Sequence, residues 1–326
     1  MSLPATAEAL TRFADNGQRL LDTIGSVVLG QDEVVRQVVL TLLAGGHVLL
    51  EGVPGVGKTL LVRTLAASLD ADYARIQFTP DLMPADITGT MMLRDDEGGR
   101  SFVFQPGPLF GNVILADEIN RATPKTQSAL LEAMQEQTVT VGDRTRLLPQ
   151  PFFVLATQNP LEMEGTYPLP EAQLDRFLLK VVVPFPSPES LRAIGLQTVG
   201  PEPQVVPVLD RDTILEMIDA ARTVPIAGPV MDHAIALLLA TRPESSRIDL
   251  IRKYVHAGAG PRGLQAMLRA SQVRALLDGR YHVSTEDVRA LAVPALRHRL
   301  LLTFEAQADG IVPETLLEYV LDATAP

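Results

Sequence analysis

The first half of the chain alternates short, almost wholly apolar runs with longer segments in which apolar residues recur every three or four positions. Continuous apolar runs of this length are typical of strands buried on both faces, and the three-and-four spacing is typical of amphipathic helices. Because strands that alternate with helices form parallel sheets, the pattern predicts an α/β fold with helices on both faces of the sheet. The predicted strands are 48–50, 73–78, 112–117, 152–159 and 177–185, and the predicted helices are 6–24, 31–43, 59–69 and 123–137.

Two segments interrupt this alternation, and a third ends it. Residues 91–104 contain two β-like runs around an acidic, glycine-bearing turn, and residues 137–148 repeat the arrangement around Gly142 and Asp143. Both have the signature of a β-hairpin inserted into the α/β plan. The proline-rich segment 184–190 then marks a change of composition, as a linker does.

Length and pattern together predict two domains. A chain of 326 residues is long enough for about two domains. We expect an α/β domain at residues 1–186 and a smaller, all-helical domain without a convincing strand at residues 187–326. Its predicted helices are 210–222, 229–241, 262–278, 284–291 and 313–322.

Composition narrows the class of protein. The net charge of −11 argues against a broadly cationic surface for nucleic acid or anionic lipid. The absence of cysteine excludes disulfides, thiolate zinc sites and cysteine nucleophiles, and it fits a reducing compartment. No signal-peptide pattern opens the chain, and the most membrane-like stretch, 38–50, is shorter than the ~20 apolar residues of a spanning helix. We therefore expect a cytoplasmic protein without a membrane span.

A glycine-rich loop lies between the first predicted strand and the helix that follows it. The sequence from Gly52 to Thr59, GVPGVGKT, fits the phosphate-binding pattern G-x-x-x-x-G-K-[ST] in its required strand–loop–helix context. Glycines let the backbone amides curl around an anion, and the helix directs its positive dipole end to the same place. Lys58 would reach the β- and γ-phosphates, and the Thr59 hydroxyl would ligate Mg²⁺.

Polar residues also follow two later strands. Asp117 and Glu118 end the apolar run VILADE, where Asp117 would hold Mg²⁺ through its water shell and Glu118 would deprotonate the attacking water. An Asp-Glu pair after a strand is also compatible with a solvated turn. Asn159, in LATQNP, could position the lytic water or contact the γ-phosphate, although an Asn-Pro turn explains it equally well on local grounds.

Two arginines are further candidates. Arg176, in EAQLDRF, is either a surface ion-pair partner of Asp175 or an arginine finger that reaches a neighbouring subunit's γ-phosphate. Arg262 begins a predicted helix, where a cation opposes the dipole, so it is either an ordinary surface residue or a group placed to meet an anion. The basic cluster LRHRLLL at 296–302 is interpreted as a solvated helix face, with contact to a neighbouring subunit as the alternative.

The phosphate loop, the Asp-Glu strand end, the strand-terminal Asn, the pre-strand Arg and the late helical Arg occur in an order that resembles AAA+ ATPases. The phrases GVPGVGKT, DEINRA, ATQNP, LPEAQLDRF and GPRG resemble, more narrowly, the MoxR group of that superfamily. The resemblance extends from about residue 27 to the C-terminal helices. It implies a parallel five-stranded P-loop NTPase core with a helical lid, assembled into a ring, usually a hexamer, with ATP between subunits.

Transferred residue by residue, the resemblance makes Gly52–Thr59 the Walker A loop and Asp117 with Glu118 the Walker B pair. Asn159 matches sensor 1, Arg176 the trans-acting finger and Arg262 the sensor 2 of the lid, while Arg121 is a second candidate for the finger. Magnesium would be held through Thr59 and Asp117. The residues expected at the nucleotide are Gly30, Gln31, Val53, Pro54, Gly55, Val56, Gly57, Lys58, Thr59 and Leu60.

The resemblance also indicates a function. Relatives are thought to be chaperones that remodel or activate protein complexes, often inserting a metal cofactor and often working with a partner that carries a von Willebrand factor A domain. The two hairpins match inserts that face substrate or partner in this group. The alternatives are a helicase-like motor, which Arg144 and Arg146 favour and Asp143 opposes, and a non-hydrolysing ATP switch, which the presence of Glu118 disfavours.

Overall fold

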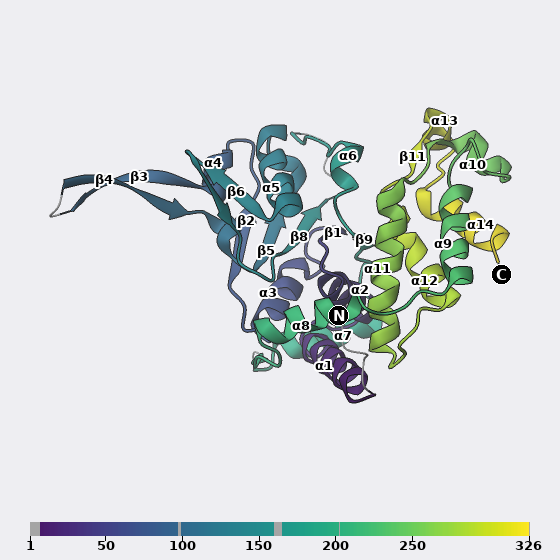
Figure 1. The fold of residues 1–326 in the computed structure, drawn as a ribbon, viewed down its shortest axis with the longest axis horizontal. Helices are drawn as coiled ribbons and strands as arrows, with labels where there is room; N and C mark the ends of the chain where they lie inside the picture. Colours follow the sequence, from purple (N-terminus) through teal and green to yellow (C-terminus); the bar gives the residue numbers. More distant parts are fainter. Residues whose placement is uncertain (1–6, 97–98, 160–164, 202, 326) are drawn as a thin grey trace.

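Five parallel strands form one sheet at the centre of the N-terminal domain (Figure 1). The computed structural model describes residues 7–96, 99–159, 165–201 and 203–325. Residue 6 of the first predicted helix, the 97–98 turn of the first hairpin and Pro160 of ATQNP lie outside the described residues. The strands lie in the order β2 (Tyr73–Gln77), β5 (Val113–Asp117), β8 (Phe153–Gln158), β1 (Val48–Glu51) and β9 (Leu179–Val182).

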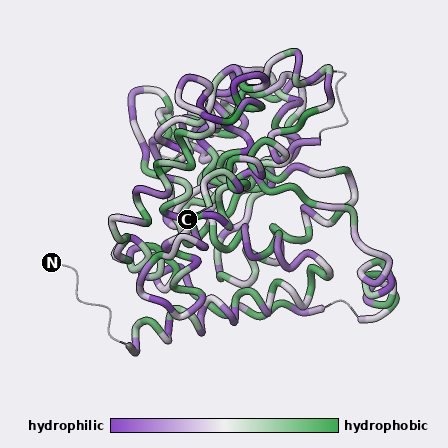
Figure 2. The backbone as a smooth tube through the Cα atoms, turned by 90° about the vertical axis from the view of Figure 1, so that its right-hand side faces the viewer, coloured by the Kyte–Doolittle hydropathy of each residue, from purple (hydrophilic) through white to green (hydrophobic). Residues whose placement is uncertain are grey.

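Both faces of the sheet are buried, as the continuous apolar strands predicted. Successive residues of a strand point to opposite faces, so Leu50 joins a core with helices α1 (Ala7–Gly25), α2 (Asp32–Leu43) and α3 (Lys58–Ser68). Leu49 joins a second core, under α5 (Pro124–Glu136). Hydrophobic and hydrophilic residues alternate along the turns of the helices (Figure 2), as amphipathic helices require.

The two predicted hairpins are present. The long one, β3 (Gly89–Asp96) with β4 (Gly99–Pro106), follows the short helix α4 (Pro84–Thr88) and projects from the domain (Figure 1). The short one is β6 (Thr138–Val141) with β7 (Arg144–Leu147). The two hairpins touch where the guanidinium of Arg146 stacks over the ring of Phe104 at 4.0 Å.

The C-terminal part of the chain is helical, with one small exception. Residues 255–257 (β10) and 301–302 (β11) form a short antiparallel pair, so the expectation of no strand after residue 187 was wrong in this detail. These strands are too short to leave an alternating pattern in the sequence. The helices are α8 (Arg211–Ala221), α9 (Gly228–Ala240), α10 (Asp249–Tyr254), α11 (Pro261–Leu277), α12 (Thr285–Leu296), α13 (Phe304–Ala308) and α14 (Pro313–Ala323).

The proline-rich segment leads directly into a helix that the sequence reading missed. Helix α7 (Pro188–Thr198) has proline in its first turn, and the Ser187 hydroxyl caps it by accepting a hydrogen bond from the Ser190 N–H at 3.2 Å. Helix α8 contacts α2 of the first domain, so the chain does not separate cleanly at the predicted linker, and the 186/187 boundary stays a prediction. Every helix in the described part of the chain is too short or too polar to span a bilayer.

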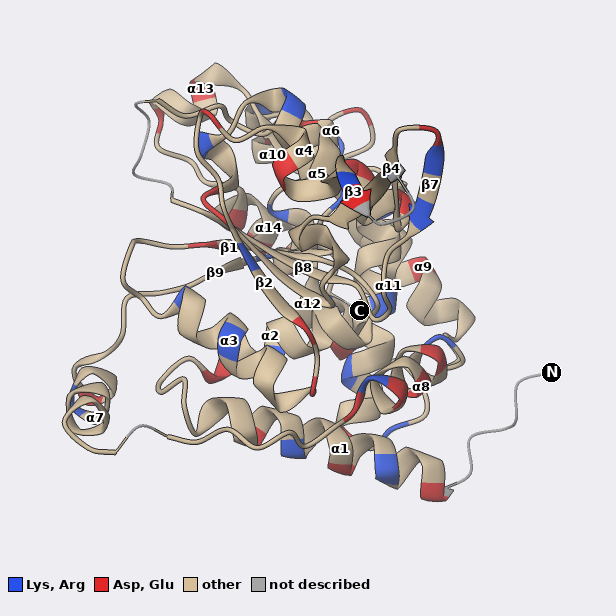
Figure 3. Ribbon diagram, turned by 90° about the vertical axis from the view of Figure 1, so that its left-hand side faces the viewer, with Lys and Arg blue, Asp and Glu red and all other residues tan. Residues whose placement is uncertain are grey.

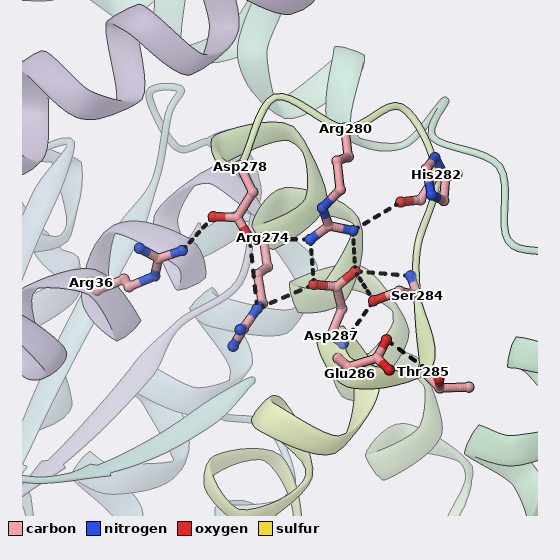
Figure 4. Close-up of polar contacts among 9 residues, drawn as sticks. All are labelled: Arg36, Arg274, Asp278, Arg280, His282, Ser284, Thr285, Glu286 and Asp287. Carbon is pink, nitrogen blue, oxygen red and sulfur yellow. Dashed lines mark hydrogen bonds and ion pairs between the residues drawn. The ribbon is translucent and has the colours of Figure 1, made fainter. Parts of the chain in front are cut away.

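A buried carboxylate fixes the connection between α11 and α12 (Figure 4). The Asp287 side chain is 1% exposed and accepts hydrogen bonds from Arg280 at 2.7 and 2.8 Å and from the Ser284 N–H at 2.8 Å. Asp278, at the end of α11, pairs with Arg36 of α2 at 2.7 Å. The network therefore stabilises the helical domain internally and ties it to the first domain.

Candidate functional site

The predicted chemistry converges at the carboxyl ends of three neighbouring strands. β5, β8 and β1 are adjacent in the sheet, and each is followed by one of the predicted polar motifs. Ligands of open α/β sheets bind at this edge. A cavity of about 350 Å³ lies here, lined by Pro54, Gly55, Gly57, Lys58, Thr59, Leu60, Asp117, Glu118 and Asn159.

The phosphate loop, residues 52–59, has the backbone that its glycines allow. Gly55 has φ +81° and Gly57 has φ +88°, both in the left-handed region that disfavours other residues. Gly52 packs against Val183, the residue after β9, and a Cβ on Gly52 would lie 2.9 Å from the Val183 carbonyl oxygen. The Lys58 ammonium donates to the Gly52 carbonyl at 2.6 Å, which holds the lysine across its own loop.

The segment expected at adenine lies against the phosphate loop. The Gln31 side chain is 5% exposed and donates its amide to the Val56 carbonyl at 2.6 Å. Gly30 has φ +71°, and a Cβ there would lie 2.0 Å from the Ser190 hydroxyl of α7. Gln31 therefore supports the loop backbone, and Gly30 allows α7 to approach; contact of either residue with a base stays a prediction.

The two carboxylates are held by specific donors. Asp117 accepts from the Thr157 hydroxyl at 2.7 Å and from Arg75 at 2.6 Å. Glu118 accepts from Gln77 at 2.8 Å and from Arg121 at 3.0 Å. The solvated-turn alternative does not describe this arrangement, because both side chains have fixed protein partners and line the same cavity.

The backbone at Glu118 explains how its side chain is aimed. Glu118 has φ +56° and ψ +51°, an uncommon conformation for a residue with a Cβ. Its N–H donates to the Thr157 hydroxyl at 2.8 Å, and the same hydroxyl donates to Asp117. Thr157 therefore fixes both carboxylates from the neighbouring strand. The sequence analysis did not identify Thr157, although its place near the end of β8, two residues before Asn159, was a usable signal.

The lining of this cavity fits a triphosphate and a small hard cation. Left-handed glycines, the start of α3 and Lys58 supply N–H and ammonium donors for phosphate oxygens. Thr59 and Asp117 line the cavity with oxygen atoms that could ligate a cation. In the described residues no cluster of three or more His, Asp or Glu side chains forms a metal site. A cation held by only one or two protein oxygens plus phosphates is the arrangement that Mg²⁺ prefers.

Arg176 and Arg262 lie together in a different cavity. This second cavity has a volume of about 290 Å³ and lies between the segment before β9 and helix α11. The Arg262 guanidinium is 3.8 Å from the Asp175 carboxylate, so the anion that it meets within its own subunit is Asp175. Asp175 pairs with Arg262 and with Arg299 rather than with Arg176, and the Nε of Arg176 has no hydrogen-bond partner among the residues that the structure describes.

The basic cluster at 296–302 is not a solvated helix face, and that interpretation was wrong. His298 is 6% exposed, and the Arg299 side chain is 3% exposed. Burial lowers the pKa of Arg299, and its bond to Asp175 opposes this effect; burial also holds the pKa of His298 well below its usual range. Apart from the Ala295 carbonyl, the acceptors for both side chains lie in residues 175–178, far away in sequence, which is why the local pattern did not reveal their burial.

A larger cavity of about 710 Å³ adjoins the phosphate-loop cavity. It lies between α3, Tyr73 of β2 and residues 197–205, and Leu60 lines both cavities. Its lining includes Val27 but none of the charged groups described above at the phosphate loop.

Known proteins match the chain over both of its parts. Residues 47–179 match the sequence model of the ATPase family associated with various cellular activities (AAA), and residues 248–319 match that of the AAA lid domain. A Mycobacterium tuberculosis protein named chaperone MoxR1 is 43% identical over 323 residues, covering 99% of this chain and 85% of that protein.

A second relative and a solved structure also match nearly the whole chain. Protein MoxR of Methylorubrum extorquens is 33% identical over 340 residues, covering 97% of each chain. The crystal structure of a candidate ATPase from Cytophaga hutchinsonii superimposes with a TM-score of 0.90 at 40% identity, covering 97% of this chain and 96% of that one. The sheet with its phosphate loop and the C-terminal helices therefore both have counterparts in known proteins.

Proposed function

Because the chain belongs to the MoxR family of AAA+ ATPases, we propose that it hydrolyses MgATP at the cavity between the phosphate loop and the Asp117–Glu118 pair. The reaction breaks the β–γ phosphoanhydride bond in a homo-oligomeric ring, expected to be a hexamer. Its turnover drives remodelling, activation or cofactor insertion in a protein complex. The observation that carries the proposal is the convergence of Lys58, Asp117, Glu118 and Asn159 on one cavity.

Each residue of the cavity has a separate role in the proposed reaction. Lys58 and the loop amides bind the phosphates, and Thr59 with Asp117 holds the metal. Bound Mg²⁺ supplies charge neutralisation on the phosphate oxygens. Glu118 takes the proton of the attacking water, after Gln77 and Arg121 release its carboxylate, and Asn159 orients that water.

The site is completed by the neighbouring subunit. Arg176 and Arg262 share a cavity that is separate from the phosphate loop of their own chain, which supports a role at the neighbour's γ-phosphate. An arginine supplied in trans stabilises the charge of the transition state. Arg121 is the weaker candidate for the finger, because it is bonded to Glu118 within its own subunit at 3.0 Å.

The long hairpin is the proposed contact for a client or for a partner with a von Willebrand factor A domain. Met92 is 51% exposed, Leu93 53% and Phe102 71%, which is unusual for a surface without a partner. The expected compartment is the cytoplasm.

The charges of the described residues do not favour the alternative, a nucleic-acid motor. Figure 3 shows Lys and Arg interspersed with Asp and Glu on the side that carries the hairpins. Arg146 is already engaged with Phe104 and with the Val141 carbonyl.

The test is the Glu118→Gln variant. Fluorescent-ATP titration should give a dissociation constant like that of the wild type, whereas phosphate release should fall by about 10²–10⁴-fold, the usual contribution of a general base. Glu132→Gln, on the exposed side of α5, is the matched control and should keep both properties. Wild-type turnover by Glu118→Gln would refute the assignment of the base.

A further inference from the structure

Arg299 lies buried in a cage of acceptors from the loop that carries Arg176. Its Nε donates to the Asp175 carboxylate at 2.7 Å, and its Nη2 donates to the Phe177 carbonyl at 2.7 Å and the Asp175 carbonyl at 3.1 Å. Its Nη1 donates to the Leu178 carbonyl at 3.1 Å and to the Ala295 carbonyl. One lid side chain thus contacts three of the four residues from 175 to 178.

Neighbouring groups reinforce this contact. The His298 ring, in the same lid segment, contacts the Phe177 carbonyl at 3.1 Å. The other oxygen of Asp175 faces Arg262, the first-turn arginine of α11, at 3.8 Å. Asp175 therefore lies between Arg299 and Arg262, and Arg299 also binds the backbone on each side of Arg176.

The chemistry of the cage requires arginine. A guanidinium has five donors in a rigid plane and serves several acceptors at fixed angles, whereas an ammonium is a point charge on a flexible stem. With its side chain only 3% exposed, Arg299 cannot exchange these acceptors for water. Its donors fix the Asp175 and Phe177 backbone, and so they fix the position from which the Arg176 side chain projects.

We propose that Arg299 is a positioning residue for the site in the neighbouring subunit. It locks the loop of Arg176 to the lid and, through Asp175, aligns Arg262, so that both arginines reach the neighbour's nucleotide as one rigid unit. This inference rests on the proposed function, in which those two arginines act in trans. It assigns the buried part of the basic cluster a role at a subunit boundary without contact to the nucleotide.

The first test compares two lysine substitutions in the same segment. Arg299→Lys keeps the charge beside Asp175 but loses the planar donors, and we expect ATP turnover to fall about 10²-fold, as for a displaced catalytic group. Its affinity for fluorescent ATP should stay within twofold of the wild type, because its own phosphate loop is untouched. Arg297→Lys is the matched control, since Arg297 pairs with Glu314 at 3.3 Å and not with the Arg176 loop; it should keep full turnover.

The second test separates positioning of the neighbour from damage to the variant's own site. Arg299→Lys subunits retain a complete Glu118 site, and Glu118→Gln subunits retain a correctly held Arg176. Reassembly of equal amounts places an intact arginine unit beside an intact Glu118 at about one quarter of the interfaces. Turnover should therefore recover to about a quarter of the wild-type value, whereas each variant alone stays near background. Asp175→Asn, which changes the same contact from the other side, should behave in the same way.

The outcomes discriminate between the two proposals. Full turnover by Arg299→Lys, or no recovery on mixing while an Arg176→Ala and Glu118→Gln mixture does recover, would overturn the role of Arg299 alone. Failure of the Arg176→Ala and Glu118→Gln mixture would overturn the trans-acting finger itself, and with it the premise. Recovery of turnover in both mixtures supports both the trans-acting role of Arg176 and the positioning role of Arg299.

Discussion

The Asp287 network allows the sharpest prediction of stability. Asp287→Asn keeps the shape of the side chain but removes the charge that Arg280 and Arg274 face at 2.7 and 3.1 Å. The carboxylate is 1% exposed, while both arginines are 31% exposed. The substitution therefore leaves two guanidinium groups without their buried partner and with only partial access to water.

The expected loss is moderate to large. Removing one member of a buried ion pair lowers the free energy of unfolding by about 3–5 kcal/mol. Here the two arginines have partial access to water and Asp278 still lies beside Arg280, so we expect a smaller loss of about 2–3 kcal/mol. Asp249→Asn is the matched control, because the Asp249 side chain is 89% exposed beside Arg252. Exposed pairs of this kind contribute about 0–1 kcal/mol.

Urea unfolding of the two variants and the wild type, without nucleotide, measures these differences in the free energy of unfolding.

The pH dependence of the unfolding free energy gives a second test of the Asp287 network. Burial alone would raise the pKa of Asp287, but hydrogen bonds from Arg280 and Ser284 outweigh it, so the pKa lies below its ordinary value of 3.8. A carboxylate with a lowered folded-state pKa stabilises the fold above its unfolded pKa and loses that effect as the pH falls through the folded pKa.

The free-energy difference between wild type and Asp287→Asn should therefore be constant from about pH 7 to pH 5 and shrink below about pH 4. If Asp287→Asn unfolds at the same urea concentration as Asp249→Asn, the assignment of the network as a stabilising element is wrong.

Three further predictions concern the ATP site. The Arg75 guanidinium is 2.6 Å from the Asp117 carboxylate and 48% exposed, so in the proposed site it would compete with magnesium. Arg75→Met should therefore lower the Mg²⁺ concentration for half-maximal fluorescent-ATP binding about threefold; an unchanged or higher requirement would contradict this. An alanine at position 57 disfavours the left-handed backbone of the phosphate loop by about 1–2 kcal/mol. Because ATP must then restore that backbone, the ATP affinity of Gly57→Ala should fall about tenfold by titration calorimetry. Gly195→Ala, in open space on α7, should bind ATP normally. Turnover per subunit should decline on dilution as rings dissociate and Arg176 leaves the neighbour's site; a constant value down to the monomer would remove the finger assignment.

Much of the geometry of the candidate ATP site could be predicted because its signals are local. The phosphate loop requires glycine at left-handed positions, and Gly55 and Gly57 have that backbone. Nearly continuous apolar runs identified the central strands β1, β5 and β8, since the sheet is buried on both faces there, whereas the edge strand β2 contains Arg75 and Gln77 and is only partly buried. Asp117, Glu118 and Asn159 follow adjacent strands, so parallel topology was enough to bring them together.

The features that escaped prediction depend on distant partners. Arg299 looks exposed in its own segment, and most of the acceptors that make its burial possible belong to residues 175–178, about 120 positions earlier. Helix α7 has no buried residue in this structure, so its residues carry no core-facing pattern. The placement of Arg262 beside Asp175 and away from the phosphate loop depends on how the helical domain packs on the first domain, which no local pattern specifies.

A structure of the Glu118→Gln protein determined with ATP and Mg²⁺ tests the central claim most directly. We expect the triphosphate in the cavity of residues 54–60, with Lys58 at the γ-phosphate, the metal between Thr59 and Asp117, and Arg176 of a second subunit facing the terminal phosphate. Nucleotide bound elsewhere, such as the larger cavity beside Tyr73, with the phosphate loop empty, would contradict the account.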